Sequence, residues 1–167
     1  ADIKPVFDEK LDTWVAPFFM APINTKNIHR SNSLMNHFYG EDFCYNEMWV
    51  QGSGDAGKAA ADFISSSNPL SDAPKPGEGP SRESRENGNY DVLFCGDIDE
   101  QSVHVSVKGD MDPGYGSTSK MISESAICLV KESEDLHGGI YTPAPAMGTK
   151  LIQRLQDNAG LTFEIEN

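Results

Sequence analysis

Two apolar runs that lie close together in the chain, Asp91–Cys95 and Ser102–Lys108, constrain the fold more than any other feature of the sequence. The segment that separates them, Gly96–Gln101, is short and polar, and this arrangement predicts an antiparallel hairpin. In the second run valine alternates with polar residues from position 103 to 107. We therefore expect one face of the hairpin to be buried and the other to be exposed.

The other predicted elements show no regular alternation of strand and helix. Helical patterns occur at about 24–38, 55–66, 117–131 and 143–158. Further strands are expected at 43–50 and 161–165. We therefore predict an α+β fold, with a mixed, mainly antiparallel sheet and helices packed on one face.

Two local expectations qualify this prediction. The prolines at 17 and 22 exclude a long helix or a central strand within residues 1–21. In the helix at 117–131, five apolar residues are expected to face the core: Met121, Ile122, Ala126, Leu129 and Val130.

The length of 167 residues suits one domain, which we expect to span residues 1–167. Residues 65–89 are rich in serine, proline and glycine and contain four of the ten prolines. This composition predicts a long loop at about 65–89.

The charge balance disfavours several classes of partner. The chain has 26 acidic and 13 basic residues, a net charge of −13. A chain this acidic repels phosphate backbones and anionic lipid, so nucleic acid and membrane surfaces are poor candidates. No apolar run approaches the roughly 20 residues of a membrane span, so we expect none.

The chain has three cysteines, and each lies within an apolar run: Cys44, Cys95 and Cys128. An odd number at such positions predicts reduced, buried thiols in a cytoplasmic protein. The four histidines show neither HxxxH nor HExxH spacing, so no metal site is expected.

The segment Gly52–Ala59 has the GxxxxGK spacing of a phosphate-binding loop, and it follows a predicted strand and opens a predicted helix. However, Ala59 occupies the position where that motif needs serine or threonine to hold magnesium. A hairpin-built sheet also lacks the parallel βαβ units of such enzymes. We therefore interpret the segment as a glycine- and alanine-rich turn.

The segment Gly109–Lys120 contains glycines at 114 and 116 and leads into a predicted helix. Backbone N–H groups at a helix N-terminus can hold a carboxylate or a phosphate. Tyr115 and Lys120 could position or protonate a substrate group there. The alternative interpretation is a capped loop that feeds the helix.

The segment Asn24–Asn32 is an unusually polar helix start that carries His29 and Arg30. A cationic pair at this position could meet an anionic cofactor or substrate. The alternative is a solvated helix face, with Asn24 or Thr25 as the helix cap.

The order of several segments along the chain resembles the second domain of bacterial saccharopine dehydrogenase-like proteins. The resemblance extends from about Trp14 to Ile165. The segments that carry it are Ala16–Thr25, Arg30–Asn32, Tyr39–Glu47, Lys75–Ser81, Asp112–Met121 and Gly138–Gly148. This family includes mycobacterial trans-acting enoyl reductases.

The resemblance implies a parent protein of two domains. Its N-terminal Rossmann domain would bind NAD or NADP, and the present chain would be the second domain, without that Rossmann domain. The second domain would cover the nicotinamide, shape the substrate pocket and form a homodimer. The implied reaction is hydride transfer to or from a small or lipid-like substrate. No cofactor is expected to bind the isolated chain, which should be inactive.

On this hypothesis we assign four residues to substrate binding: Asn24, Arg30, Tyr115 and Lys120. Tyr115 and Lys120 are also the candidate catalytic residues, with Arg30 and Lys120 contacting anionic groups and Tyr115 orienting or protonating the substrate. Two alternatives stay open. One is a non-catalytic binding or interaction module with the same fold, and the other is a small nucleotide hydrolase that uses Gly52–Lys58.

Overall fold

The computed structural model describes residues 4–67, 75 and 77–166, whose helices and antiparallel sheets confirm the expected α+β class. The contacts group the chain into two compact units, Ala1–Pro74 and Lys75–Asn167. Each unit contains a three-stranded sheet, and every strand pairing among the described residues is antiparallel. The expectation of one domain over residues 1–167 stays a prediction.

The first unit has a sheet with the strand order β1-β2-β3. Its elements are β1 (Val6–Asp8), β2 (Thr13–Pro17), α1 (Ala21–Leu34), β3 (Met48–Gly52) and α2 (Gly54–Ser66). The prediction that residues 1–21 contain no central strand is wrong, because β2 lies between the other two strands. Pro17 is tolerated because it is the last residue of β2, opposite Met48.

Helix α1 begins earlier than expected. Pro22 occupies its first turn, where the missing N–H is not needed, so neither Asn24 nor Thr25 is the cap. The helix ends at Leu34, because Asn36 and His37 adopt the left-handed conformation with φ of 54° and 58°. The strand expected at 43–50 likewise starts later, as β3, whereas α2 matches the helix expected at 55–66.

The second unit has a sheet with the strand order β4-β5-β6. Its elements are α3 (Arg82–Glu86), β4 (Tyr90–Ile98), β5 (Gln101–Gly109), α4 (Gly116–Glu132), α5 (Pro143–Asn158) and β6 (Leu161–Glu166). The predicted hairpin is confirmed as β4 and β5, in a register that sets Phe94 opposite Val105. The expected loop at 96–101 is wrong in its bounds, because the strands pair up to Ile98 and Gln101 and leave only residues 99–100 as the turn. Of the predicted loop at 65–89, residues 68–74 and 76 lie outside the described residues, and the part after them contains α3.

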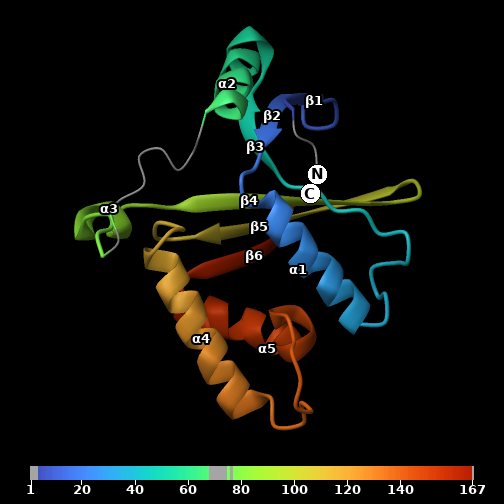
Figure 1. Cartoon of the computed structure of the whole chain (residues 1–167), viewed down its shortest axis with the longest axis vertical. Helices are drawn as coiled ribbons and strands as arrows, with labels where there is room; N and C mark the ends of the chain where they lie inside the picture. The colour runs from blue at the N-terminus through green and yellow to red at the C-terminus, as the bar shows by residue number, and fades with distance from the viewer. Residues whose placement is uncertain (1–3, 68–74, 76, 167) are drawn as a thin grey trace. The chain divides into compact units, whose positions relative to one another are not determined.

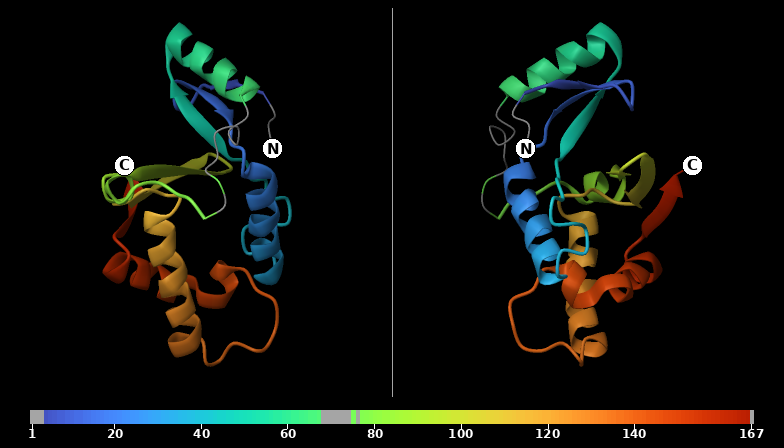
Figure 2. Two further views of the ribbon diagram at one scale, coloured as in Figure 1. Left: turned by 60° about the vertical axis from the view of Figure 1, so that its left-hand side comes forward. Right: turned by 90° about the vertical axis from the view of Figure 1, so that its right-hand side faces the viewer.

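The core of the second unit lies between the sheet and helices α4 and α5, which cover the same face of the sheet (Figures 1 and 2). Leu155, Ala159 and Leu161 are buried at its centre. Val107 and Phe163 of the sheet pack against them, together with Met121 and Leu151 of the helices. Burial of these side chains supplies the main force that holds the helices on the sheet.

The far end of the same sheet face is not covered by the helices. Val103 of β5 is 51% exposed, Phe94 of β4 is 45% exposed and Ile165 of β6 is 72% exposed. These residues share the face of Val107 and Phe163, because the register places Phe94 and Ile165 opposite Val105 on either side. The alternation in the sequence marks the apolar face, but the expectation of one buried and one exposed face is wrong here. Val103 and Phe94 of the apolar face are exposed, whereas Ser106 on the other face is 2% exposed.

The inward face of helix α4 matches the predicted one only at Met121. Met121 packs against the core and Cys128 is fully buried, seven residues further along the helix. Ile122, Leu129 and Val130 are exposed instead. The sequence offers two apolar stripes on this helix, and periodicity alone does not show which one meets the sheet.

A pair of short charge-assisted contacts joins α4 to α5. The Arg154 guanidinium donates to Glu124 Oε2 and to Glu132 Oε1, each at 2.6 Å. Helix α5 is also interrupted at Gly148, whose φ of 51° and ψ of −134° are not helical. The bend separates the proline-rich first turn from the part of α5 that contacts the core.

None of the three cysteines forms a disulfide, but the expectation that all are buried is wrong. Cys128 is buried, whereas Cys44 and Cys95 are exposed. Cys95 pairs with His104 and so lies on the face of β4 opposite to that of Phe94. Within the described residues, none of the helices has the length and apolar character needed to cross a membrane.

Candidate functional site

The loop before α4 is organised by one carboxylate, that of Asp112. Its oxygens accept hydrogen bonds from the backbone N–H groups of Gly114, Tyr115 and Gly116, at 3.1, 3.0 and 2.6 Å. Its backbone carbonyl accepts the N–H of Ser117 at 2.9 Å. Desolvation acts to raise the pKa of Asp112, but these backbone hydrogen bonds and the nearby Arg85 charge outweigh it, so the pKa is lowered.

The same contacts decide between the two interpretations that the sequence leaves open for this helix start. The backbone N–H groups at 114, 115 and 116 bond to Asp112, which supports the capped loop over an open anion site. The carboxylate that binds these N–H groups is a side chain of the protein and not a ligand. An acidic side chain is favoured here, because the N-terminal end of a helix has free N–H groups and a partial positive charge. Any ligand of this region must therefore bind beside the cap, through side chains.

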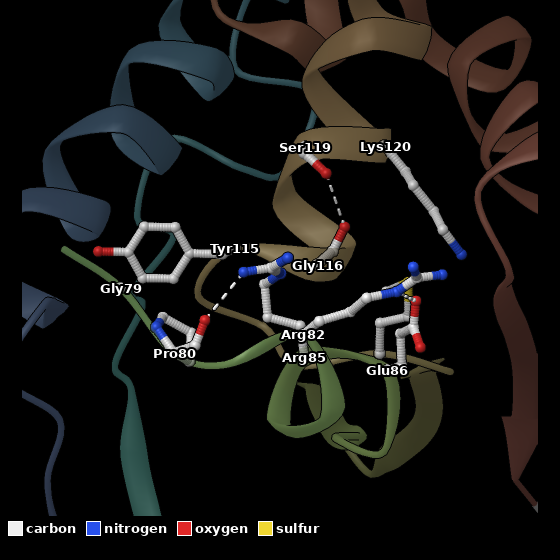
Figure 3. A pocket seen from close by; sticks show the side chains of 10 residues that line it. Gly79, Pro80, Arg82, Arg85, Glu86, Tyr115, Gly116, Ser119 and Lys120 are labelled. Atoms are coloured by element: carbon white, nitrogen blue, oxygen red, sulfur yellow. Dashed lines mark hydrogen bonds and ion pairs between the residues drawn. The ribbon is translucent and has the colours of Figure 1, made fainter. Parts of the chain in front are cut away.

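A cavity of about 460 Å³ lies beside the cap, within the second unit. Figure 3 shows its walls: α3 and the segment before it on one side, and the start of α4 on the other. The Asp112 backbone N–H donates to the carbonyl of Arg85 at 3.0 Å, and this bond ties the two walls together. Tyr115 and Lys120, the two candidate catalytic residues, both line this cavity.

Three cationic side chains line the cavity. The Arg82 guanidinium pairs with Glu86 at 2.6 Å, and the Lys120 ammonium pairs with Asp110 at 3.2 Å. Arg85 donates from its guanidinium to the carbonyl of Pro80 at 2.8 Å. The cavity therefore gathers three cations, although Glu86 also lines it and Asp110 and Asp112 lie beside two of them.

Tyr115 forms the opposite end of the cavity from Lys120 and Arg82 (Figure 3). Its side chain is exposed, and its ring lies beside Gly79, where an added Cβ would be 3.7 Å from the ring. The phenol can therefore reach a bound molecule as a donor or an acceptor. Its backbone position is fixed by the bond to Asp112.

The other two candidate substrate-binding residues lie in the first unit. Asn24 donates from its amide to Glu47 Oε2 at 2.9 Å, and the Tyr45 hydroxyl donates to the other oxygen of Glu47 at 2.6 Å. Desolvation, followed by this hydrogen bond and the Glu47 charge, raises the pKa of Tyr45. Arg30 lies on an exposed position of α1. The structure thus brings Tyr115 and Lys120 to one cavity, and the substrate roles of all four residues stay predictions.

Arg82 and Arg85 are the two cationic cavity residues that our sequence prediction does not include. They fall within the segment expected to be a loop, about 30 residues before Tyr115 in the sequence. A local signal is present, because Ser81 precedes Arg82 and caps α3 by accepting the N–H of Ser84. That cap indicates a short helix, on which arginines three residues apart share a face.

The segment Gly52–Lys58 is a tight turn from β3 into α2. A Cβ on Gly57 would come within 1.9 Å of the Gly52 carbonyl oxygen, so this glycine allows the helix to pack on the strand. Gly52 and Gly54 have φ of 99° and 65°. The Lys58 ammonium pairs with Asp62 and lies 5.5 Å from the centre of the Trp14 ring. These contacts support the interpretation as a structural turn.

The three glycines of this turn, at 52, 54 and 57, also have the GxGxxG spacing of dinucleotide-binding turns. In a dinucleotide-binding domain the turn follows a strand of a parallel sheet. Here β3 pairs antiparallel with β2, and Asp55 adds a carboxylate to the first turn of α2. The residues present do not fit NAD or NADP, so we assign none of them to cofactor binding.

Several curated mycobacterial proteins are similar to this chain. A Mycobacterium tuberculosis protein, provisionally named as a trans-acting enoyl reductase, is 33% identical over 168 residues, which cover 88% of this chain and 40% of the relative. Trans-acting enoyl reductases of Mycobacterium ulcerans and Mycobacterium bovis are 29% identical over 162 residues, which cover 85% of this chain and 39% of each relative. The chain thus spans about 40% of the length of these relatives. No protein-family model and no solved structure matches it.

Proposed function

We propose that this chain is the substrate-binding domain of an NAD(P)-dependent oxidoreductase of the saccharopine dehydrogenase-like type, which transfers a hydride. The observation that carries the proposal is a similarity that extends over most of this chain. It matches a segment of about 40% of the length of proteins named as trans-acting enoyl reductases. The cavity beside Tyr115 and Lys120 supports it, because it offers a proton donor and a cation to a substrate.

The proposal divides the work between two parts of a parent protein. A separate N-terminal nucleotide-binding domain would hold NAD or NADP, which supplies or accepts the hydride. In the present chain Tyr115 would orient the substrate or exchange a proton with it, and Lys120 would bind an anionic group. Asn24 and Arg30 would add substrate contacts, and a second copy of the parent would form a homodimer. The isolated chain would be inactive.

The test uses the parent protein, with turnover measured by NADPH and NADH absorbance. Tyr115→Phe and Lys120→Ala should each reduce kcat/KM by about tenfold to a hundredfold, because each removes a charge-assisted or proton-transfer contact in the transition state. Tyr141→Phe and Lys131→Ala are the matched controls, since both side chains lie outside the cavity. They should leave turnover near the wild-type value.

Turnover that survives both cavity substitutions would remove Tyr115 and Lys120 from the mechanism. A parent protein without any nucleotide-dependent turnover would instead favour the binding or interaction module. Loss of turnover in the control variants would mean that the cavity variants act through folding.

A further inference from the structure

We propose that the cavity between α3 and the start of α4 binds the phosphate group of a phosphate monoester, with Arg82, Arg85 and Lys120 as its ligands. The inference deepens the proposed function and rests on it, because it takes this cavity to be part of the substrate site. It adds the two arginines of α3 and names the chemical class of the ligand.

The first argument is the position of the charges. Lys120 reaches one end of the cavity from α4, and Arg82 reaches the same end from α3 (Figure 3). Arg85 instead points to the Pro80 carbonyl at the other end. A phosphate that contacts all three cations therefore draws Arg85 away from Pro80. The hydrogen bond from Asp112 to the Arg85 carbonyl holds the two walls of the cavity together before any ligand arrives. The site is therefore pre-organised by the backbone, which lowers the cost of binding.

The second argument is that two of these cations, Arg82 and Lys120, are available. Arg82 and Glu86 form an ion pair whose side chains are 82% and 50% exposed, and the Lys120–Asp110 pair is also solvent-accessible. Exposed ion pairs contribute little to stability. A bound dianion can therefore replace Glu86 and Asp110 as the partner of these cations.

The third argument distinguishes phosphate from carboxylate. One arginine satisfies a carboxylate with a bidentate contact, whereas a phosphate monoester has three terminal oxygens and a charge of up to −2. Two guanidinium groups and one ammonium match that charge and number of acceptors. A single carboxylate would leave part of this set without a partner.

The fourth argument is the apolar end of the cavity. The Tyr115 ring and Pro80 lie at the end of the cavity away from Lys120 (Figure 3). An aromatic face beside a cationic group suits a ligand whose phosphate is joined to a flat or apolar part. Phenyl phosphate is therefore the simplest probe that uses both ends.

The test is an NMR titration of this chain, with amide shifts recorded at constant ionic strength. The probes are inorganic phosphate, phenyl phosphate and acetate. We expect phosphate to shift amides of residues 79–86 and 115–120 saturably, phenyl phosphate to bind at least about threefold more tightly, and acetate to bind at least about tenfold more weakly than phosphate.

Variants locate the site. Arg85→Gln should weaken phosphate binding about tenfold or more, since it removes a charge-assisted contact. Arg85→Lys keeps the charge and should give an intermediate loss. Tyr115→Ala should abolish the advantage of phenyl phosphate and leave inorganic phosphate unchanged. Lys58→Gln is the matched control. It also removes an ion-paired cation, but Lys58 lies on α2 and does not line the cavity.

Unchanged phosphate binding in folded Arg85→Gln, or equal binding of acetate and phosphate, would overturn the inference. If Arg85→Gln unfolds, Arg82→Gln serves as the second variant, and its retention of full affinity would have the same meaning. The proposed function fails separately. It is lost if the parent protein shows no nucleotide-dependent turnover, whatever the phosphate titration shows.

Discussion

Two glycine-containing loops lead into helices of this chain, and they resemble each other in sequence far more than in structure. The loop into α2 is filled by its own backbone, because Gly57 packs against the Gly52 carbonyl. The loop into α4 is capped by the Asp112 carboxylate and leaves a cavity beside it. Glycine therefore permits backbone packing in the first loop and access to a side-chain cap in the second.

The comparison predicts the largest effect for Gly57→Ala. Its new Cβ would meet the Gly52 carbonyl oxygen at 1.9 Å, and backbone atoms cannot move away as a side chain can. We expect a loss of about 3 kcal/mol or more in the free energy of unfolding, measured by urea denaturation. Gly138→Ala is the control, because a Cβ at that position would have no neighbour within 4 Å. A loss below that of the control would contradict the packing role.

Gly116→Ala should have the next largest effect. Its Cβ would lie 2.7 Å from Asp112 Oδ2 and 3.0 Å from Met111 Cβ, so the cap must shift. We expect a loss of about 1–3 kcal/mol. The matched control is Gly79→Ala in the same cavity wall, whose Cβ makes only an ordinary contact with the Tyr115 ring. Equal stability of the two variants would show that Gly116 does not serve the cap.

The loop into α4 should contribute to the acid sensitivity of the chain through Asp112. The folded-state pKa of Asp112 is lowered, so its stabilising contribution is present above its unfolded pKa and is lost as the pH falls through the folded pKa. Asp112→Asn should destabilise the chain near neutral pH and flatten this part of the acid dependence of the melting temperature.

Asp135→Asn makes the same change of charge at an exposed position and should follow the wild-type curve. An Asp112→Asn curve parallel to wild type at every pH would show that the carboxylate charge is not what holds the loop.

Gly54→Ala should have the smallest effect of the series. Its φ is 65°, which costs an L-residue about 1–2 kcal/mol, but its Cβ would have no neighbour within 4 Å. Thermal melting should therefore show a modest loss, well below that of Gly57→Ala. A loss as large as for Gly57→Ala would mean that conformational freedom, and not packing, explains both glycines.

The sequence predicts the elements best where local chemistry marks their ends. Pro143 and Gly160 bracket α5, and the polar segment at 96–101 marks the hairpin, so both are confirmed. The start of α1 is not predicted correctly, because Pro22 can end an irregular segment or open a helix. The covered length of the sheet cannot be predicted, since it depends on where α4 and α5 cross it.

The candidate site is predictable only where its residues are close in sequence. Tyr115 and Lys120 belong to one loop and helix start, so a single motif contains both. Arg82 and Arg85 reach the same cavity through a contact between their helix and Asp112, which no local pattern reveals. The sequence allows a capped loop at this helix start but does not identify Asp112 as the residue whose carboxylate caps it.

The uncovered end of the β4–β5–β6 sheet has a consequence for how this chain behaves in solution. β4 is an edge strand with exposed apolar residues, and such strands promote aggregation. Mutual repulsion from the charge of −13 opposes this at neutral pH. Near the isoelectric point of about 4.5 that protection vanishes. The chain should therefore precipitate most readily in mild acid, and acid melting curves need dilute protein.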